Sequence, residues 1–290
     1  MPPIAPEEAR QATNLHYELP PEYFEAFLDT RMKYSSGLYR TPGCTLEQAQ
    51  TAKLEFVAER LALTGGESLL DIGCGWGSLT LFMAQEYGCA VTGVTPSQPQ
   101  AAYIREKARA GGVADRVEIR VGSFSALPMS GEYDAATMLG SIVHMPDRGA
   151  VLRKAYGLLR RRGRLYLSES CFRNAEVYRE FADRPGTLHV TETTFGFADM
   201  VPLSTLVEAT ESAGFSLEAM DDLTAHYQRT IEEWEHRALL NQERIEAVAP
   251  GMSQSLVRYL RTANAGWGYT TKHYALTAAK ARLAAKALPA

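Results

Sequence analysis

The chain has 290 residues, enough for one catalytic domain with a sizeable insertion or an appended lobe but short for two full domains. Its hydrophobic content of 46%, charged content of 22% and net charge of −4 are ordinary for a soluble globular protein and argue against DNA or RNA as a partner. The four cysteines form no C-x-x-C pair, which argues against a metal site of the structural zinc type and against a disulfide framework.

The N-terminus, M-P-P-I-A-P-E-E-A-R, has no basic region followed by an apolar core and therefore does not resemble a signal peptide. The sequence has no apolar run that approaches the roughly 20 residues of a membrane span. These features predict a cytoplasmic protein without stable membrane insertion.

Residues 1–63 are predicted to form an N-terminal helical cap. Apolar residues recur at helical spacing after Pro20, at Tyr23, Phe24, Phe27 and Leu28. The stretch T-L-E-Q that starts at Thr45 has the spacing of a capping box, so it predicts the start of a second helix, which runs through Leu61.

From Ser68 onwards strands alternate with helices, which predicts a parallel sheet covered on both faces. Strands are expected over 69–72, 90–95, 117–121, 133–139 and 164–169, within a cofactor-binding core of residues 64–171. The pattern breaks down over 172–202, which indicates a lid-like insertion. Residues 203–290 are expected to complete the core and to contribute a long helical segment that covers the molecule on which the protein acts. They contain a helix over 203–213, an edge strand after Gly214, a long amphipathic helix over 230–263 broken near Pro250, and a last strand over 269–277.

The segment L-L-D-I-G-C-G-W-G places Gly73, Gly75 and Gly77 where a predicted strand meets a predicted helix. Glycines at such a junction allow a tight turn and the close approach of a ligand to backbone N–H groups. Dinucleotide-binding folds use a similar triplet, and a plain glycine turn is a further alternative. The compact spacing, Asp71 at the end of the strand, and Thr95 rather than an acid at the end of the next strand favour S-adenosylmethionine.

Several further blocks carry a family resemblance. They are H-Y-E-L-P-P-E-Y-F-E-A-F-L-D, M-K-Y-S-S-G-L-Y, L-E-Q-A-Q-T-A-K-L and G-V-T-P-S-Q-P-Q, with H-Y-Q-R-T-I-E-E-W and G-Y-T-T-K-H-Y-A-L near the C-terminus. With them the chain resembles the cyclopropane-fatty-acid-synthase-like family of S-adenosylmethionine-dependent methyltransferases, in its small-molecule and natural-product branch. The resemblance covers most of the chain. It implies a Rossmann-like class I methyltransferase fold of the α/β class, with a mostly parallel seven-stranded sheet, helices on both faces, N-terminal helices and a helical lid insertion.

The resemblance also implies a cofactor site for S-adenosylmethionine. Tyr34, Ser35 and Gly73 would hold the methionine part of the cofactor. Thr95 and Gln100 would lie on the ribose, and two residues after the third strand would border the adenine. The complete expected set is Tyr34, Ser35, Ser36, Asp71, Gly73, Gly75, Gly77, Thr95, Gln100, Ser123, Phe124 and Leu139.

The loop L-G-S-I-V-H-M-P-D-R follows the fourth strand. In the cyclopropane synthases of this family, a glutamate before the histidine and a second histidine after the next strand help hold a bicarbonate ion that acts as base. Val143 and Ser168 stand at these positions, which argues against cyclopropanation by that route. We instead expect His144 to act as a base, Glu169 to orient it or share the proton, and Tyr227 to approach the acceptor. A histidine that only caps its loop and a solvated strand-end carboxylate are the alternatives.

The acceptor is expected under the N-terminal helices and the insertion. Aromatic side chains suit a flat or alkenyl molecule, and the candidates are Tyr39, Phe172, Phe181, Phe195, Phe197, Trp234, Trp267 and Tyr269. A second set, Arg31, Lys33, Arg40 and Arg173, would indicate a phosphorylated acceptor if its members converge.

The function predicted is methyl transfer to a small-molecule acceptor, apolar or alkenyl, at carbon of an alkene or an activated ring. A prenyl diphosphate is one candidate acceptor. The alternatives are N- or O-methylation of a natural product, lipid methylation of the cyclopropane-synthase type, and a non-catalytic cofactor-binding protein. An oligomer is compatible with the sequence.

Overall fold

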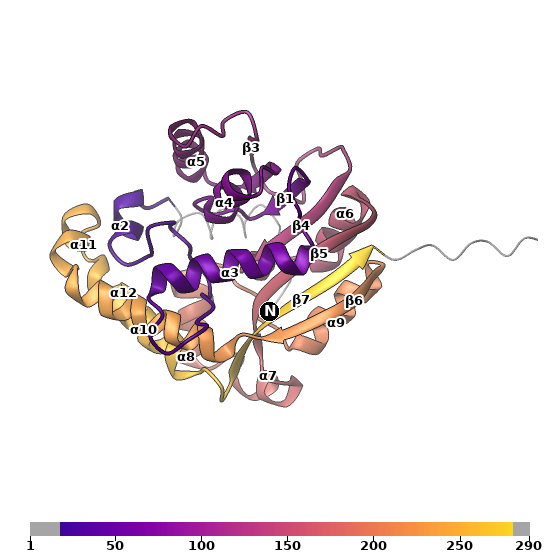
Figure 1. Cartoon of the computed structure of the whole chain (residues 1–290). Helices are drawn as coiled ribbons and strands as arrows, with labels where there is room; N and C mark the ends of the chain where they lie inside the picture. The colour runs from indigo at the N-terminus through magenta and orange to yellow at the C-terminus, as the bar shows by residue number, and fades with distance from the viewer. Residues whose placement is uncertain (1–17, 281–290) are drawn as a thin grey trace, which may run out of the picture.

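The computed structural model of the protein describes residues 18–280. The start of the predicted cap (1–17) and the end of the last segment (281–290) lie outside the described residues. The centre of the described part is a seven-stranded sheet with the strand order β3-β2-β1-β4-β5-β7-β6 (Figure 1). The predicted α/β class, with a mostly parallel sheet between layers of helices, is confirmed.

The first five strands pair in parallel and the last two are antiparallel. Strands β1 (Ser68–Ile72), β2 (Ala90–Thr95), β3 (Val117–Val121), β4 (Tyr133–Leu139) and β5 (Leu159–Phe172) form the parallel part. Strand β7 (Thr271–Lys280) lies between β5 and β6 (Phe215–Asp222) and is antiparallel to both. The edge position predicted for the strand after Gly214 is confirmed.

The helices of the described residues are α2 (Pro21–Glu25), α3 (Leu46–Leu61), α4 (Ser78–Glu86), α5 (Gln98–Ala110), α6 (Arg148–Leu158), α7 (Ala175–Phe181), α8 (Pro185–Leu188), α9 (Leu203–Ser212), α10 (Thr224–Leu240), α11 (Gln242–Val248) and α12 (Met252–Ala265). A short 3-10 helix, η1 (Ile142–His144), follows β4, and a π-helix, η2 (His189–Thr194), continues directly from α8. The capping box at Thr45 is present, because its side chain accepts the Gln48 N–H while the Gln48 side chain accepts the Thr45 N–H.

The prediction of one long helix over 230–263 with a single break was wrong about where the helix starts and about how many breaks it has. The first helix already begins at Thr224, where Asp222 accepts the Thr224 N–H. The expected break near Pro250 exists, with Gly251 in the left-handed region at a φ of 80°. A second break falls at Asn241, whose backbone leaves the helical region with a φ of −113° and a ψ of 24°. Its backbone N–H and its side-chain amide both donate to the Arg237 carbonyl, at 3.0 and 2.9 Å, which closes the last turn of α10.

Adjacent residues of β1 point to opposite faces of the sheet, as alternation along a strand requires. Leu69 packs with residues of α3 and α4, including Phe82. Leu70 packs on the other face with Val151 of α6 and Leu206 of α9. The core therefore consists of two apolar layers, one on each side of a continuous sheet, which fixes the sheet as a rigid platform.

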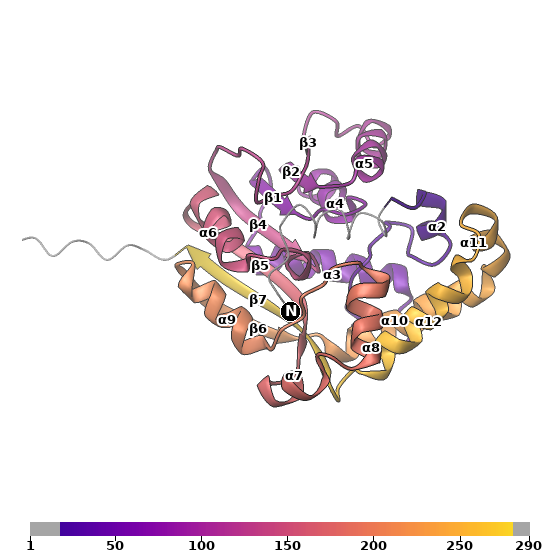
Figure 2. The ribbon, with the colours of Figure 1, turned by 180° about the vertical axis from the view of Figure 1, so that it is seen from behind.

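A separate apolar cluster joins the N-terminal helix α2 to the C-terminal helices α10, α11 and α12 at one end of the molecule (Figures 1 and 2). Phe24 of α2 lies in it with Trp76, at 5.1 Å between ring centroids. Tyr34 and Trp234 of α10 also meet there, at 5.2 Å. Because Trp76 belongs to the glycine-rich turn, this cluster connects the predicted cap directly to that turn.

The order of the strands reverses at β1. The chain runs from β1 outward to β2 and β3, and β4 then pairs on the other side of β1. Loops that leave the carboxyl ends of β1 and β4 therefore diverge and leave a crevice, the usual ligand position in sheets of this kind. The ends of β1, β2 and β4 and the loops after β1 and β3 contain eight of the twelve residues that the sequence assigned to the cofactor.

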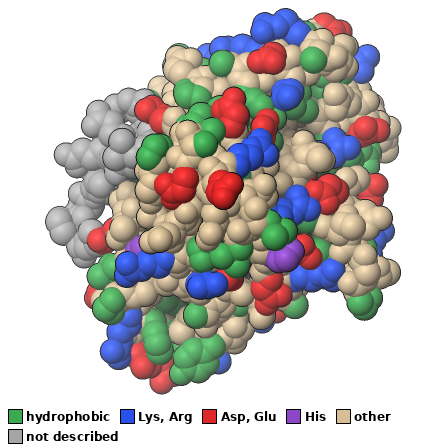
Figure 3. Space-filling view, turned by 90° about the vertical axis from the view of Figure 1, so that its left-hand side faces the viewer, with side chains coloured by type: hydrophobic (Ala, Val, Ile, Leu, Met, Phe, Trp, Pro, Cys, Tyr) green, Lys and Arg blue, Asp and Glu red, His purple; other side chains and the backbone are tan. Residues whose placement is uncertain are grey.

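The surface carries mixed charge. On the face shown in Figure 3, acidic and basic side chains alternate without a continuous basic field. In residues 18–280, no helix is both long and apolar enough to cross a membrane.

Gly77 offers a test of the packing beneath the turn. Its φ is +81°, and a Cβ built there would lie 2.5 Å from Cγ1 of Ile104. We expect Gly77→Ala to lower the free energy of unfolding by about 2–4 kcal/mol, because strain and a clash with a buried side chain add. Gly157→Ala in α6, with no atom within 4 Å of the added carbon, should be neutral or slightly stabilising. Urea unfolding measures both, and a Gly77→Ala protein as stable as the parent would contradict the clash.

Candidate functional site

Backbone hydrogen bonds hold the glycine-rich turn after β1 against the end of β2. The Gly73 and Cys74 N–H groups both donate to the Val94 carbonyl of β2, at 2.9 and 3.0 Å. A Cβ on Gly73 would lie 2.3 Å from that of Ser141, so only glycine allows the loop after β4 to approach this closely. A Cβ on Gly75 would meet no atom within 4 Å and would stand in the cavity above the turn. The turn is therefore shaped to leave space for a ligand.

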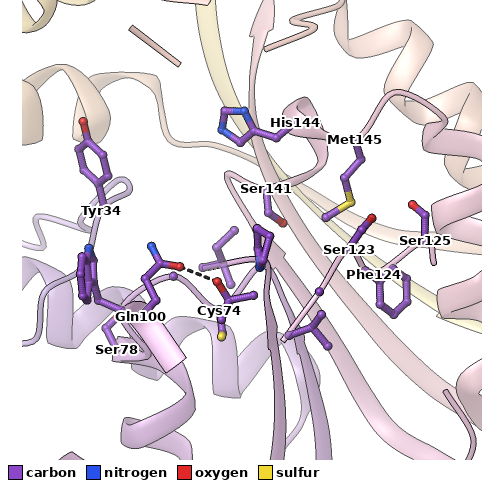
Figure 4. Close-up of a pocket in the computed structure, with 18 of the residues that line it drawn as sticks. Tyr34, Cys74, Ser78, Gln100, Ser123, Phe124, Ser125, Ser141, His144 and Met145 are labelled. Carbon is purple, nitrogen blue, oxygen red and sulfur yellow. Dashed lines mark hydrogen bonds between the residues drawn. The ribbon is translucent and has the colours of Figure 1, made fainter. Parts of the chain in front are cut away.

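A first cavity of about 1030 Å³, open solvent at its mouth included, lies over the carboxyl ends of β1 to β4. Eight residues of the predicted cofactor set line it: Tyr34, Gly73, Gly75, Thr95, Gln100, Ser123, Phe124 and Leu139. Figure 4 shows Tyr34 and Gln100 on one side and Ser123 and Phe124 on the other, with His144 above Ser141. The Thr95 hydroxyl donates to the Gln100 amide oxygen at 2.6 Å, which holds these two side chains together at the end of β2.

Four residues of the predicted set do not line this cavity. Gly77 caps the N-terminus of α4 against Ile104. Ser36 donates its hydroxyl to the Gly37 carbonyl, and Ser35 is 2% exposed with its carbonyl bonded to Gln50. These positions support the turn and the Tyr34 segment from behind, and their direct contact with a cofactor stays a prediction.

Asp71 is the fourth residue behind the cavity wall. It is 2% exposed and accepts the hydroxyls of Thr80 and Thr137, at 2.8 and 3.0 Å. Burial raises the pKa of this carboxyl, while nearby Lys33 and the two hydroxyls oppose the rise. The Asp71 carboxylate therefore links β1 to α4 and β4 by hydrogen bonds. An acid at the end of this strand can stabilise the glycine-rich turn without contacting a ligand.

His144 lies in η1 and is held by the insertion after β5. Its Nδ1 lies 2.7 Å from the Phe197 carbonyl, and the Asp199 N–H donates to the Val143 carbonyl at 2.8 Å. Arg148 adds an ion pair to the Asp199 carboxylate at 2.6 Å. The ring therefore has one orientation, set by backbone and charge of a segment more than 50 residues away. Burial lowers the pKa of His144, and the Phe197 carbonyl partly offsets this, so the site favours the neutral form of the ring.

Glu169 is a buried carboxyl near the end of β5, not a solvated one. It is 7% exposed and accepts the Val143 and Ser170 N–H groups, at 3.3 and 2.9 Å. Burial raises its pKa to about 7, against the opposing effect of these bonds and of Arg148. A carboxyl with this pKa exchanges a proton near neutral pH, as a general base must.

A second cavity of about 1640 Å³, again with open solvent included, adjoins the first. Glu169, Val143 and Tyr227 line it, and His144 lines both cavities. Tyr227 packs between Trp267, at 4.9 Å between ring centroids, and the buried His273, at 4.6 Å. The three residues predicted to be catalytic are thus brought to one cavity, next to the predicted cofactor site.

The aromatic candidates divide between this cavity and the core. Phe181, Phe195, Trp267 and Tyr269 line the second cavity, and Tyr259 of α12, which the sequence gave no reason to select, joins them. The others lie elsewhere in the core or its loops: Tyr39, Phe172, Phe197 and Trp234. Sequence could not separate the two groups, because which face of a helix turns inward depends on how the C-terminal helices pack.

The four predicted cations do not converge. Arg31 lies over the Phe82 ring, Arg40 pairs with Glu55, and Arg173 lies over Tyr269. The fourth, Lys33, lines the first cavity instead of the second. Two arginines missed by the sequence analysis, Arg184 and Arg261, do line the second cavity, and each pairs with a glutamate of the surface.

The model of the mycolic acid cyclopropane synthetase family matches residues 5–274. The chain belongs to this family. Among curated proteins, a probable fatty acid methyltransferase of Pseudomonas putida is 28% identical over 89% of this chain and 65% of its own length. Sphingolipid C9-methyltransferase 1 of Gibberella zeae is 32% identical over 83% of this chain and 47% of its own length. The chain therefore spans about half to two thirds of these curated relatives.

Among solved structures, a mycolic acid cyclopropane synthase complexed with SAH and CTAB superimposes with a TM-score of 0.84. The match has 22% identity and covers 93% of this chain and 98% of that chain. This similarity shows that the family fold extends over the sheet, the insertion and the C-terminal helices. Within the family, Val143 places an apolar side chain at the second cavity where the resemblance expects an ion ligand. Ser168 is buried, and its carbonyl accepts the Gly140 N–H.

The raised pKa of Glu169 predicts a dependence of stability on pH. The pKa rises from 4.5 in an exposed glutamate to about 7 here, so the folded protein holds the proton more tightly than the unfolded chain does. Stability of the parent protein should fall as pH rises from about 4.5 to about 7, by up to about 3 kcal/mol. Glu169→Gln cannot ionise and should lose this fall. Urea unfolding at pH 5 and pH 8 measures the difference, and parallel pH curves for the two proteins would contradict the buried carboxyl.

Proposed function

We propose that the chain is an S-adenosylmethionine-dependent methyltransferase that binds its cofactor in the first cavity and an apolar acceptor in the second. The observation that carries this proposal is His144, which lines both cavities. The ring therefore lies beside both the proposed cofactor and the proposed acceptor. The enzyme then acts chiefly by aligning the acceptor with the methyl group and excluding water.

The residues present fit the cofactor. The open space above Gly75 and the turn at Gly73 accommodate a ligand against the backbone, and Thr95 with Gln100 offers a hydroxyl and an amide at the end of β2. Ser123 and Phe124 follow β3 on the opposite wall. When bound, S-adenosylmethionine supplies an electrophilic methyl group on a sulfonium. The SAH bound to the solved family member supports the same choice of ligand for this cavity.

His144 supplies the base in this proposal. Because a carbonyl oxygen can only accept, the Phe197 carbonyl selects the tautomer with the proton on Nδ1. The lone pair of the neutral ring is then on Nε2, which can take up a proton from the acceptor. The cation formed by methylating an alkene must lose a proton from carbon to give an alkene again, and a methylated primary or secondary amine must lose one from nitrogen, so either acceptor uses this group.

The walls of the second cavity favour an apolar acceptor methylated at carbon. Phe181, Phe195, Tyr259, Trp267 and Tyr269 supply aromatic faces, which suit an alkene or activated ring and stabilise positive charge that develops during its methylation. The fatty acid and sphingolipid methyltransferases among the relatives act on molecules of this kind by name. A prenyl diphosphate would require its phosphates at Arg184 and Arg261, in competition with Glu180 and Glu235.

N-methylation is a second candidate, favoured by Glu169. A carboxyl with a pKa of about 7 within an aromatic cavity suits an amine, because the ionised form attracts an ammonium group and then accepts its proton. A panel that contains an unsaturated fatty acid, an unsaturated phospholipid, a prenyl alcohol, a prenyl diphosphate and a secondary amine separates the two candidates. Transfer of labelled methyl from S-adenosylmethionine is the readout, and cofactor binding without transfer would favour a non-catalytic protein.

Replacement of the proposed base is the direct test of the site. His144→Ala should lower turnover about 100-fold or more and change the affinity for SAH less than about threefold, because the ring acts on the acceptor side. Phe56→Ala, on the distant face of α3 beside Tyr166, is a control that removes an aromatic ring without touching either cavity. Turnover by His144→Ala equal to that of the parent would remove the residue from the mechanism.

The dependence of turnover on pH tests whether Glu169 takes part in proton removal. If its carboxylate takes part in proton removal, turnover of the parent should rise from pH 6 to pH 8 with a midpoint near 7, as the carboxyl loses its proton. Glu169→Gln should lack this step, and its remaining activity should follow the lower pKa of His144. A step that persists at the same pH in Glu169→Gln would show that another group produces it.

A further inference from the structure

Two lysines lie buried beneath the cofactor cavity. Lys33 is 8% exposed and lines the cavity beside Tyr34, Gly73 and Cys74. Lys53 of α3 is 2% exposed, and its amine meets no acceptor oxygen among residues 18–280. The two amines are close enough to interact with each other. Buried lysines are rare unless a negative group balances them.

The acids nearby are already engaged. Asp29 accepts the N–H groups of Arg31 and Lys33, and Asp71 accepts the hydroxyls of Thr80 and Thr137. None of the ion pairs within 4.0 Å in residues 18–280 includes either lysine. Both acids attract the lysines only over a longer distance. The positive charge of the cluster therefore has no direct ion pair among residues 18–280, and Lys33 borders the cavity where a ligand would bind.

Burial lowers the pKa of both lysines, and that of Lys53 falls well below its ordinary value. Asp29, Asp71 and Cys74 raise the pKa of Lys33, while Lys33 lowers that of Lys53 and Lys53 in turn lowers that of His273. A carboxylate placed at the cavity wall would favour the charged form of the pair, and the pair would favour binding of the carboxylate.

We propose that Lys33, backed by Lys53, is the counter-charge for the carboxylate of the cofactor's methionine part. This inference rests on the proposed function, because it assigns one end of the same ligand. The lysines would then place the amino-acid end of the cofactor next to Gly73, with the opposite end towards Ser123 and Phe124. A competing explanation is that the lysines serve only the fold, as partners of Asp29 and Asp71.

Titration calorimetry with two ligands separates these explanations. SAH carries the carboxylate, and its decarboxylated analogue carries the same adenosine, sulfur and amine without it. The parent protein should bind SAH at least about tenfold more tightly than the analogue, since a buried charge-assisted contact contributes on this scale. Equal affinities in the parent protein would overturn the inference while leaving the proposed function standing. Binding of neither ligand would overturn both.

Substitution identifies the residue responsible. Lys33→Met should weaken SAH binding about tenfold or more and leave the analogue unchanged or bound more tightly, because the analogue's ammonium no longer faces a positive charge. Lys107→Met, which removes an exposed lysine of α5, should change neither affinity. A Lys33→Met protein that loses affinity for both ligands equally, together with a lower Tm, would assign the lysine to the fold and overturn the proposal.

Discussion

Hydrogen bonds between the carboxyl ends of β1, β2 and β4 are the constraint on which the site depends. The turn after β1 donates two N–H groups to the last carbonyl but one of β2, and Ser141 after β4 donates its hydroxyl to the Ile72 carbonyl at 2.7 Å. Three strand ends are thereby fixed to one another. The close approach of Ser141 to Gly73 then leaves the cavity open above the turn and closed below it.

The two cavities have different structural origins. The first is built from strand ends and their turns, which the sheet holds rigidly. The second is built from the insertion, from the C-terminal helices α10 and α12, and from the ends of β5 and β7, with Tyr227 of α10 packed against His273 of β7. The proposed cofactor cavity and the proposed acceptor cavity therefore rest on largely different parts of the chain, and His144 borders both.

Local signals in the sequence were sufficient for much of the fold. The short apolar strands, the glycine-rich turn and the capping box at Thr45 each depend on neighbours a few residues away, and each is where the sequence predicted it. The start of α10 and the break at Asn241 were missed, because neither the Asp222 side chain that accepts the Thr224 N–H nor the non-helical backbone of Asn241 has a strong periodic signature. For Asp71, the sequence showed that an acid lies near the end of β1. It could not show that the side chain points away from the cavity, towards Thr80 and Thr137.

The site residues show the same division. Their positions at strand ends could be predicted, whereas their partners could not, since Phe197 lies 53 residues from His144. The burial that raises the pKa of Glu169 also has no sequence signature, because it arises from the insertion folding over the end of β5. Long-range packing therefore sets the orientation of His144 and the pKa of Glu169, which the sequence alone does not show.

The contact that orients His144 is made by a peptide carbonyl, and every amino acid has one. Position 197 can therefore change its side chain through evolution without loss of this contact, so comparison of related sequences would not mark it as important. The same holds for the laboratory: side chains of the loop can be exchanged to admit a different acceptor as long as the path of its backbone is kept. Shortening the loop, in contrast, would alter the proposed acceptor cavity and release the proposed base in a single step.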